Sequence, residues 1–537
     1  MKIVLAEKVS PATLAVFQKE AGWTVVTHDQ IKSGLAAELA DTDALVVRSA
    51  VQVDEKLLEF APKLRVIGRA GVGVDNIDAD AATRHGIVVM NTPGANAVAV
   101  AELTLAQMLT LSRQLTRANS TMHAGQWEKK SLQGVELRGK KLGILGLGRV
   151  GLEVARRARA FGMELLGHDP FVSPAVAREN EIRLVAVDDL FRESDYLTLH
   201  VGLTPQTAGI INATSLAIMK KGVRIINCAR GELIIDEALI AALKSGQVAG
   251  AALDVFTIEP PKDSPYAALD NVILTPHIAG STAEAQEAVG IQIALQVREY
   301  LKLGVVQNAV NLTSLTHDEY VEVAPYILMA QRLGEFLSQT PDGNLESIHL
   351  SYSGRIAEGK TELIRNAAIQ GVLGHSESVN RINSASVAAE RGIRIHEEKK
   401  EASSGGSGSV LKLKLHTRAG DSTASATVLH GTSPRLLSFN GIDVEAPLHG
   451  RLLCLTNRDV PGVIGRIGTT LGEHHINIAN FALGRATARN QQTSQGVPQG
   501  NALAVIQIDT EASPAVLEAL RKVEGILKVN QVSLGTD

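Results

Sequence analysis

Short apolar runs alternate with amphipathic stretches through the first part of the chain. The apolar runs are short enough for buried strands, and the stretches between them have helical periodicity, as at 11–21 and 54–61. Strands alternating with helices predict a parallel, doubly wound sheet, here a flavodoxin-like lobe. The strands expected in this first lobe lie at 2–6, 24–27, 44–48, 66–69 and 88–91.

The same alternation continues in a second lobe. A long helix with one apolar face is expected over 99–117, leading from the first lobe into the second. A helix over 282–303 should return to the first lobe, which would make that lobe discontinuous in sequence. The strands expected in the second lobe lie at 141–145, 164–168, 196–201, 224–227, 250–254 and 272–274.

Beyond residue 308 the alternation of strands and helices ends. A helix over 321–339 precedes polar–apolar alternation of period two, clearest at 410–415, and together they predict an α+β domain. Inside it, the charge run 397–400 and the Gly/Ser-rich stretch 403–409 are expected to form a flexible loop tip.

The last segment, 451–534, has the order β-α-β-β-α-β of a ferredoxin-like sheet. Its middle hairpin contains a polar insertion, 485–501, which is expected to be an exposed loop. The predicted fold is therefore two α/β lobes followed by two smaller α+β domains. The expected boundaries are 1–98 with 285–307, 99–284, 308–447 and 448–537.

Composition narrows the class of protein. The 537 residues include 45% hydrophobic and 20% charged residues, as in ordinary globular proteins. A net charge of −4 gives no electrostatic reason to expect nucleic acid or a membrane surface as a partner, and no apolar run is long enough to span a bilayer. Two cysteines, Cys228 and Cys454, exclude a disulfide framework and indicate the cytoplasm, and no residue cluster suggests a metal site.

A glycine-rich turn follows the first strand of the second lobe. Gly146, Gly148 and Gly151 have the G-x-G-x-x-G spacing that lets a pyrophosphate approach a helix N-terminus, as in Rossmann-like lobes. Asp169 ends the next strand, where a carboxylate binds an adenosine ribose. That carboxylate would repel a 2′-phosphate, so the sequence predicts NAD as the cofactor.

Candidate catalytic residues follow other strands of the same sheet. Arg230, Glu259 and His277 each come after an apolar strand, so all three are expected at the edge where the cofactor lies. Arg48 and Arg69 end two strands of the first lobe and form a candidate anion site. Each of these residues taken singly is more often structural; the combination favours an active site.

Several motifs mark a resemblance. The strings GLGRVG, NCARGEL, DVFTIEP and TPHIAGST resemble those of the D-2-hydroxyacid dehydrogenase family over about residues 1–305. Strings of the first lobe, VVRSA, IGRAGVGVDNID and NTPGANAVAVAELT, are similar to the phosphoglycerate branch of that family. The middle domain resembles the extra domain of its long form, and the terminal segment resembles an ACT regulatory domain.

The resemblance implies hydride transfer between C2 of a hydroxyacid and nicotinamide. It implies that His277 is the acid–base, that Glu259 orients it, and that Arg230 binds the substrate carboxylate. For 3-phosphoglycerate it implies a phosphate site at Arg48, Ser49, Arg69 and Asn96, with Lys129 reaching in from a neighbouring subunit of a homotetramer. The implied NAD contacts are Gly146, Gly148, Arg149, Val150, Gly151, Asp169, Cys228, Ala229, Asp254 and Gly280. Cys228 is interpreted as a packing residue, with a redox switch as the alternative.

The ACT-like segment implies an effector. The residues suggest that Asp459 caps a helix with Pro461 early in it, which would suit the carboxylate and ammonium of a free amino acid. The resemblance implies L-serine, bound between two such domains by Asp459 and Asn477 and reducing activity by feedback. The chain departs from its relatives at Asn457, where they tend to have His or Tyr. The alternative is a domain that only dimerises.

Three functions are compared on these grounds. The leading hypothesis is NAD-dependent oxidation of 3-phosphoglycerate, the first step toward serine. The alternatives are another NAD-dependent D-2-hydroxyacid dehydrogenase, which Arg48 and Arg69 disfavour, and a non-catalytic NAD-sensing regulatory protein, which Arg230, Glu259 and His277 disfavour.

Overall fold

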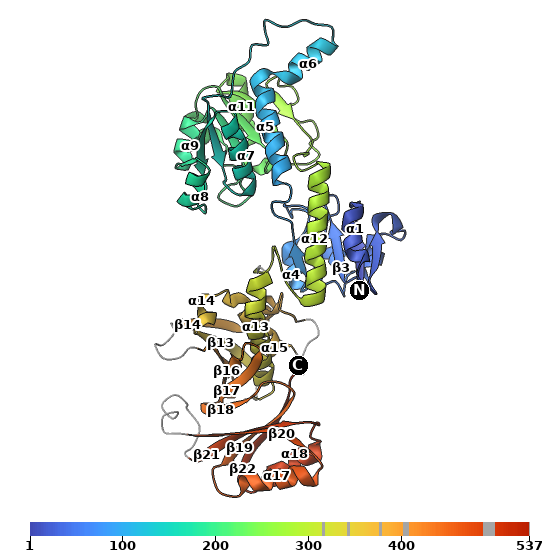
Figure 1. The fold of residues 1–537 in the computed structure, drawn as a ribbon, viewed down its shortest axis with the longest axis vertical. Coiled ribbons are helices and arrows are strands. Elements are labelled where there is room, and N and C mark those ends of the chain that lie inside the picture. Colours follow the sequence, from blue (N-terminus) through green and yellow to red (C-terminus); the bar gives the residue numbers. More distant parts are fainter. Residues whose placement is uncertain (314–316, 341–343, 375–378, 401–407, 487–499, 536–537) are drawn as a thin grey trace.

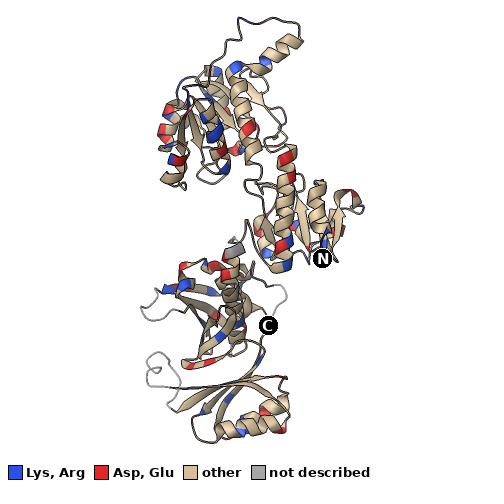
Figure 2. Cartoon of the chain, in the orientation of Figure 1, with Lys and Arg blue, Asp and Glu red and all other residues tan. Residues whose placement is uncertain are grey.

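The computed structural model describes residues 1–313, 317–340, 344–374, 379–400, 408–486 and 500–535. Four sheets form four units along the long axis of the molecule, and the first lobe lies between the second lobe and the two C-terminal units (Figure 1). Acidic and basic residues are interspersed along every unit (Figure 2). Among the described residues, no helix combines the length and apolar character needed to cross a bilayer.

The first lobe contains a five-stranded sheet. Its strands are β1 Lys2–Leu5, β2 Thr24–Thr27, β3 Ala44–Val47, β4 Val66–Arg69 and β5 Val88–Met90. All of its pairs are parallel, and the order β2-β1-β3-β4-β5 is that of flavodoxin-like folds, as predicted. Its local helices are α1 Pro11–Gln18, η1 His28–Gln30, α2 Leu35–Leu39, α3 Glu55–Leu58 and α4 Ala79–Arg84.

Helix α12, Ala283–Leu303, returns to this lobe from the second one and covers one face of its sheet. Val289, Ile293 and Val297 pack against strands β1, β3 and β4 in one apolar cluster. Gly68 permits this packing, because a β-carbon built there would come within 2.8 Å of Ile293. The discontinuous lobe thus results from an apolar helix face; the exact domain boundaries stay predictions.

The second lobe contains a seven-stranded parallel sheet in the order β12-β11-β10-β9-β6-β7-β8, a Rossmann-like order. Separate apolar clusters cover its two faces, so the sheet is doubly wound as predicted. The strands are β6 Lys141–Leu145, β7 Glu164–His168, β8 Arg183–Leu184, β9 Tyr196–Leu199, β10 Val223–Asn227, β11 Val248–Leu253 and β12 Val272–Leu274. The helices are α7 Arg149–Ala160, α8 Pro174–Glu179, α9 Val187–Glu193, α10 Ala213–Ile218, η2 Gly231–Leu233 and α11 Asp236–Ser245.

The prediction of one continuous helix over 99–117 is wrong. The chain forms α5, Ala97–Arg113, and then α6, Leu115–His123, separated by Gln114 in the left-handed region at φ 50°. No glycine or proline marks this break in the sequence. Helix α6 projects from the lobe (Figure 1), and no residue on it is buried.

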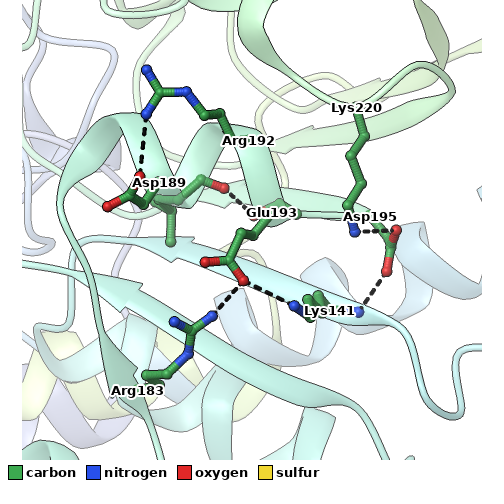
Figure 3. A network of polar contacts seen from close by, with 9 residues as sticks. Lys141, Arg183, Asp189, Arg192, Glu193, Asp195 and Lys220 are labelled. Atoms are coloured by element: carbon green, nitrogen blue, oxygen red, sulfur yellow. Dashed lines mark hydrogen bonds and ion pairs between the residues drawn. The ribbon is translucent and has the colours of Figure 1, made fainter.

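Several ion pairs lie at the amino edge of the seven-stranded sheet (Figure 3). Glu193 accepts from Lys141 at 2.8 Å and from Arg183 at 2.5 Å. Asp195 accepts from Lys220 at 2.8 Å and from the backbone N–H of Lys141 at 2.8 Å. These contacts tie the starts of β6 and β9 to the surrounding loops.

The third unit contains a mixed six-stranded sheet, ordered β14-β13-β15-β16-β17-β18. Its strands are β13 Leu345–Ser353, β14 Arg394–Lys400, β15 Val410–Thr417, β16 Gly420–Leu429, β17 Ser433–Phe439 and β18 Ile442–Pro447. Its helices are α13 His317–Ser338, α14 Arg355–Glu358, α15 Thr361–Leu373 and α16 Ser384–Glu390.

The charge run expected in a loop is wrong. Residues 397–400 belong to β14, an edge strand whose charges face solvent and whose backbone pairs in parallel with β13. Charged side chains are common on edge strands, which helps to explain this error. Residues 401–407 of the expected loop tip lie outside the described residues.

The fourth unit has the predicted order β19 Arg451–Arg458, α17 Val463–Glu473, β20 Ile478–Arg485, β21 Asn501–Ile508, α18 Pro514–Lys522 and β22 Ile526–Ser533. Most of the expected insertion, 487–499, lies outside the described residues. One apolar cluster joins this sheet to the preceding one, with Leu452 and Val505 packed in the same core as Leu436 and Phe439. The two C-terminal units therefore form one packed body.

Candidate active site

A cleft of about 590 Å³ lies between the first two lobes, at the carboxyl ends of both parallel sheets. This is the edge where ligands bind in such sheets. Residues of both lobes line it, and it brings together most of the residues predicted for substrate and catalysis. Those in its lining are Arg48, Ser49, Arg69, Asn96, Glu259 and His277, whereas Arg230 is not part of it. Gly280, a predicted NAD contact, also lines the cleft.

His277 and Glu259 form the predicted pair. His277 Nδ1 lies 2.7 Å from Glu259 Oε2, and Glu259 Oε1 accepts from the backbone N–H of Phe256 at 3.0 Å. With the proton on Nδ1 donated to the carboxylate, Nε2 is left as an acceptor. The His277 side chain is 51% exposed, so a ligand in the cleft can reach Nε2.

The loop before this histidine is fixed by Asp254, which is fully buried. Its carboxylate accepts from Thr275 Oγ1 at 2.5 Å and from the backbone N–H groups of Ile278 and Ala279 at 2.9 and 2.8 Å. These bonds hold His277 in the left-handed region at φ 52°. In the structure, Asp254 thus positions the loop that carries His277.

Three arginines converge beside this pair. Burial and the neighbouring Arg230 guanidinium hold the pKa of Arg69 below its usual value. Arg69 Nε is buried without a hydrogen-bond partner among the described residues. Arg230 reaches across from the second lobe to Asp75, with Nη2 at 3.1 Å from Oδ2. Mutually repelling guanidiniums are stabilised by an anion, so the structure favours a negatively charged ligand here.

Arg48 is held by two residues that the sequence interpretation missed. Its side chain donates to Gln286 Oε1, and Gln286 Nε2 donates to Gly280 O at 2.9 Å. Glu7 accepts from the backbone N–H of Arg48 at 2.7 Å and so fixes the turn after β3. Glu7 follows the end of β1 and could have been found by the rule that selected Arg48. Gln286 has no such signal, because it lies inside α12.

The glycine turn fits a dinucleotide. Gly146 has φ 95°, and a β-carbon on Gly151 would lie 2.1 Å from Gly146 O, so both positions require glycine. A β-carbon on Gly148 would project into open space over the N-terminus of α7, where a pyrophosphate would lie. Asp169 accepts from the backbone N–H groups of Leu147 and Phe171, each at 2.8 Å. No group of metal-ligand side chains occurs among the described residues.

The remaining predicted cofactor residues differ in placement. Ala229, which follows β10, and Val150, at the start of α7, are both half-buried. Arg149 donates to the carbonyl of Pro93, so its side chain links the two lobes. Cys228 is buried and donates to Gln107 Oε1 at 3.2 Å, and burial raises the pKa of its thiol to about 12. A protonated, enclosed thiol agrees with a packing role.

The two remaining residues predicted for the phosphate, Lys129 and Asn96, differ in placement. Lys129 is exposed on the segment after α6, which projects from the second lobe, and it does not line the cleft of its own chain. Asn96 does line the cleft, and its Oδ1 is buried with no partner among the described residues. The Oδ1 of Asn96 can therefore accept a hydrogen bond from a ligand in the cleft, whereas Lys129 could reach only the cleft of a second chain.

The expected helix cap in the ACT-like unit is wrong. Helix α17 begins at Val463 with Gly462 as its N-cap in the left-handed region, so Asp459 and Pro461 precede the helix. The geometry of Gly462 allows the chain to enter the helix without a side-chain cap. Asp459 instead pairs with Arg485 at 3.2 Å, and Asn477 Nδ2 donates to Asp509 at 2.6 Å.

Three family models match the chain: the D-isomer specific 2-hydroxyacid dehydrogenase NAD-binding domain over 105–279, the D-3-phosphoglycerate dehydrogenase intervening domain over 322–440, and the ACT domain over 451–525. The chain is 37% identical to D-3-phosphoglycerate dehydrogenase of Methanocaldococcus jannaschii, over 99% of this chain and 100% of that protein. It is 40% identical to D-3-phosphoglycerate dehydrogenase of Synechocystis, over 95% of this chain and 91% of that protein.

Solved structures agree for the first two lobes. A glyoxylate reductase from Paecilomyes thermophila is 31% identical with a TM-score of 0.53, over 58% of this chain and 98% of that one. D-lactate dehydrogenase from Aquifex aeolicus, complexed with NAD and lactic acid, is 29% identical with a TM-score of 0.52, over 58% of this chain and 100% of that one. The two lobes therefore have the fold of NAD-dependent 2-hydroxyacid dehydrogenases.

Proposed function

The chain belongs to the D-3-phosphoglycerate dehydrogenase family of NAD-dependent enzymes, and we propose that its cleft oxidises 3-phospho-D-glycerate to 3-phosphohydroxypyruvate, the first step toward L-serine. The observation that supports this most is the cleft itself, in which a His–Glu pair lies together with Arg48 and Arg69, and Arg230 pairs with Asp75 of the lining. The His–Glu pair suits the oxidation of an alcohol, and the arginines suit a substrate with two anionic ends.

His277 takes the proton of the C2 hydroxyl on Nε2 as the C2–H bond breaks. Glu259, 2.7 Å from Nδ1, stabilises the imidazolium that results and keeps the ring aimed at the substrate. Bound NAD⁺ supplies the acceptor for the hydride. Proton and hydride leave the same carbinol, so the products are the 2-keto acid, NADH and a protonated histidine that releases its proton to solvent.

The two anionic ends of the substrate bind separately. Arg230 is proposed to hold the carboxylate in a bidentate fork, exchanging its contact with Asp75. Arg48, Ser49, Arg69 and Asn96 are proposed to hold the phosphate. The buried, unpartnered Nε of Arg69 and the lowered pKa of this guanidinium support that assignment, since a phosphate dianion would relieve both.

NAD is proposed to lie along the carboxyl edge of the seven-stranded sheet. The pyrophosphate would lie on the Gly146–Gly151 turn, and Asp169 would accept from the adenosine ribose hydroxyls with the lone pairs that its two backbone contacts leave free. The resemblance extends these contacts to Arg149, Val150, Cys228, Ala229, Asp254 and Gly280.

A homotetramer in the cytoplasm is proposed as the working form. The segment of α6 and the loop after it exposes Leu115, Met122 and Trp127, the last at 78%. Apolar side chains on a projecting arm favour burial against a second chain. Such a partner would bring Lys129 toward a neighbouring cleft. Both cysteines are free and buried, which agrees with a reducing compartment.

L-serine is proposed as a feedback effector of the ACT domain. The charge of Asp459 would meet the ammonium group, which would have to compete with Arg485. A thermal-shift titration tests this proposal: L-serine should raise the melting temperature of the wild type but not of Asp459→Ala. An equal rise in both would contradict the role of Asp459.

NADH formation tests the proposed reaction. We expect turnover with 3-phospho-D-glycerate to exceed turnover with D-glycerate and D-lactate, because neither of these has a group for the phosphate site. Equal turnover with D-lactate would instead support a different 2-hydroxyacid dehydrogenase. Binding of NADH without turnover on any of the three would support a regulatory protein.

A further inference from the structure

Asp75 and Glu259 are the two acidic residues in the described lining of the catalytic cleft. Glu259 is bonded to His277, whereas Asp75 has no part in the proposed chemistry. Asp75 lies on the loop that follows β4, and its side chain is 69% exposed. A carboxylate in a cleft for anionic ligands needs a physical explanation, because it repels them.

Asp75 forms an ion pair that joins the two lobes. Its partner, Arg230, follows β10 of the second lobe, and the Nη2 atom lies 3.1 Å from Oδ2 of Asp75. Gly73 permits this approach, because a β-carbon built there would lie 2.0 Å from Nη2 of Arg230 and 2.7 Å from Oδ2 of Asp75. The guanidinium thus lies against the first lobe and holds a carboxylate, which is the group that it is proposed to bind in the substrate.

Two carboxylates near Arg69, those of Asp75 and Glu7, are held in different ways. Burial and the Arg230 guanidinium lower the pKa of Arg69, and the charges of these two carboxylates oppose that change. Glu7 is fixed by three backbone N–H groups of the loop after β3, at 2.7 to 3.3 Å. Asp75 has Arg230 as its only hydrogen-bond or ion-pair partner among the described residues. An exposed carboxylate with one partner can turn into solvent when another anion replaces it.

The backbone beside Asp75 is anchored independently of this ion pair. The neighbouring Asn76 is buried, and its Nδ2 donates to the carbonyl of Arg48 at 3.0 Å and to that of Val51 at 2.7 Å. These bonds hold the loop on the first lobe whether or not Arg230 contacts Asp75. Release of Arg230 therefore requires the Asp75 side chain to move, and the loop can stay in place.

We propose that Asp75 occupies, before substrate binds, the place on Arg230 that the substrate carboxylate takes, and that it thereby limits how tightly the cleft binds its substrate. This inference rests on the proposed function of the cleft and deepens it. The apparent affinity for a carboxylate is reduced by the fraction of molecules in which Asp75 leaves Arg230 free. Asp75 is thus a positioning residue that keeps the guanidinium in place and weakens the binding of its ligand.

Calorimetry on the full chain with oxalate tests the competition. Oxalate has carboxylates for Arg230 and no C–H bond to oxidise, so it binds without turnover. We expect Asp75→Asn and Asp75→Ser to bind oxalate about two- to fivefold more tightly than the wild type, because an exposed ion pair contributes about that much. Asp75→Glu keeps the carboxylate and should bind close to the wild type. The matched control is Asp80→Asn, an exposed aspartate of the same lobe outside the cleft lining, which should not change the affinity.

A gain in affinity is a result that damage to the fold does not produce. Unchanged or weaker binding of oxalate to both Asp75→Asn and Asp75→Ser, an equal gain in Asp80→Asn, or no binding to any of these chains would each overturn the proposal. Thermal melts show that each variant is folded, and oxalate should raise the melting temperature more for Asp75→Asn than for the wild type. Because oxalate is not oxidised, the role of Asp75 is tested even in a chain that fails to oxidise 3-phosphoglycerate.

Kinetics locate the effect at the carboxylate end of the substrate. In Asp75→Asn, kcat/KM should rise about two- to fivefold for both 3-phospho-D-glycerate and D-glycerate, because both have the carboxylate that Arg230 is proposed to hold. A rise confined to the phosphorylated substrate would assign Asp75 to the phosphate and overturn its role as a stand-in for the carboxylate.

Discussion

Charged side chains are arranged differently at the two edges of the seven-stranded sheet. At the amino edge, Glu193 and Asp195 each form ion pairs with lysine or arginine side chains (Figure 3). At the carboxyl edge, the neighbouring Arg230 guanidinium contributes to lowering the pKa of Arg69, and His277 exposes half of its side chain. Closely paired charges contribute to the stability of the fold, whereas neighbouring guanidiniums, one of them with a buried Nε that has no partner among the described residues, favour an anionic ligand. The comparison predicts that substitutions at the first edge change stability and those at the second change chemistry.

The largest effect is expected from His277→Ala. Loss of the proton acceptor should lower kcat by about 10²–10⁴-fold, as for other general acid–base residues. NADH binding, measured by fluorescence, should persist, because the glycine turn is untouched. The control from the amino edge, Lys220→Met, should keep the wild-type kcat. Full activity in His277→Ala would remove the acid–base assignment.

A smaller effect is expected from Gln286→Leu, which removes the contact between Arg48 and Gly280. We expect the KM for 3-phospho-D-glycerate to rise by about two- to tenfold, from the ~0.5–1.5 kcal/mol of one hydrogen bond. The kcat should change little, because His277 stays in place. Exposed Glu284 on the same helix supplies the control, Glu284→Gln. A fall in kcat with no change in KM would argue against a positioning role.

The amino edge is tested by Asp195→Asn. Burial acts to raise the pKa of Asp195, but hydrogen bonds from Lys220 and the Lys141 backbone outweigh it and the pKa is lowered. Because the pKa of Asp195 is lower in the folded chain than in the unfolded chain, its carboxylate stabilises the fold at pH values above the unfolded pKa of ~3.9. This stabilisation is lost as the pH falls through the lower, folded pKa. At pH 7 the variant should lose about 1 kcal/mol, reduced by solvent screening, with kcat unchanged.

Thermal melts across pH check this prediction. The gap in melting temperature between the wild type and Asp195→Asn should be full at pH 7 and should shrink below pH 4. A gap that grows on acidification would contradict the sign of the pKa shift.

The smallest effect is expected at Cys228. Because burial raises the pKa of its thiol to about 12, the thiolate is scarce at pH 8 and alkylation should be slow in the folded chain. Cys454 has a similarly raised pKa and is the internal control. Mass spectrometry after iodoacetamide treatment measures both. Rapid labelling of Cys228 alone, with loss of activity, would instead favour the redox switch.

Local hydrophobic patterns in the sequence predicted the strands of the first lobe. All five strands of the first lobe were expected within two residues of their observed bounds, because buried parallel strands are continuous apolar runs. The cleft residues were found because parallel strands end at one edge. Long-range pairing explains one error, because β14 is a strand through its pairing with β13. The break at Gln114 interrupts a helix that the neighbouring residues favour, and nothing in the structure explains it. Gln286 acts through Arg48 from inside α12, so its position gave no signal, whereas Glu7 lies after a strand end and could have been found.

We propose above all that the first lobe holds the phosphate of the substrate through Arg48. A cycle of kcat/KM values for 3-phospho-D-glycerate and D-glycerate, in wild type and Arg48→Ala, measures that contact directly. We predict that Arg48→Ala lowers kcat/KM for the phosphorylated substrate about ten- to hundredfold more than for D-glycerate, as expected of a charge-assisted hydrogen bond. Equal losses on both substrates would contradict the account.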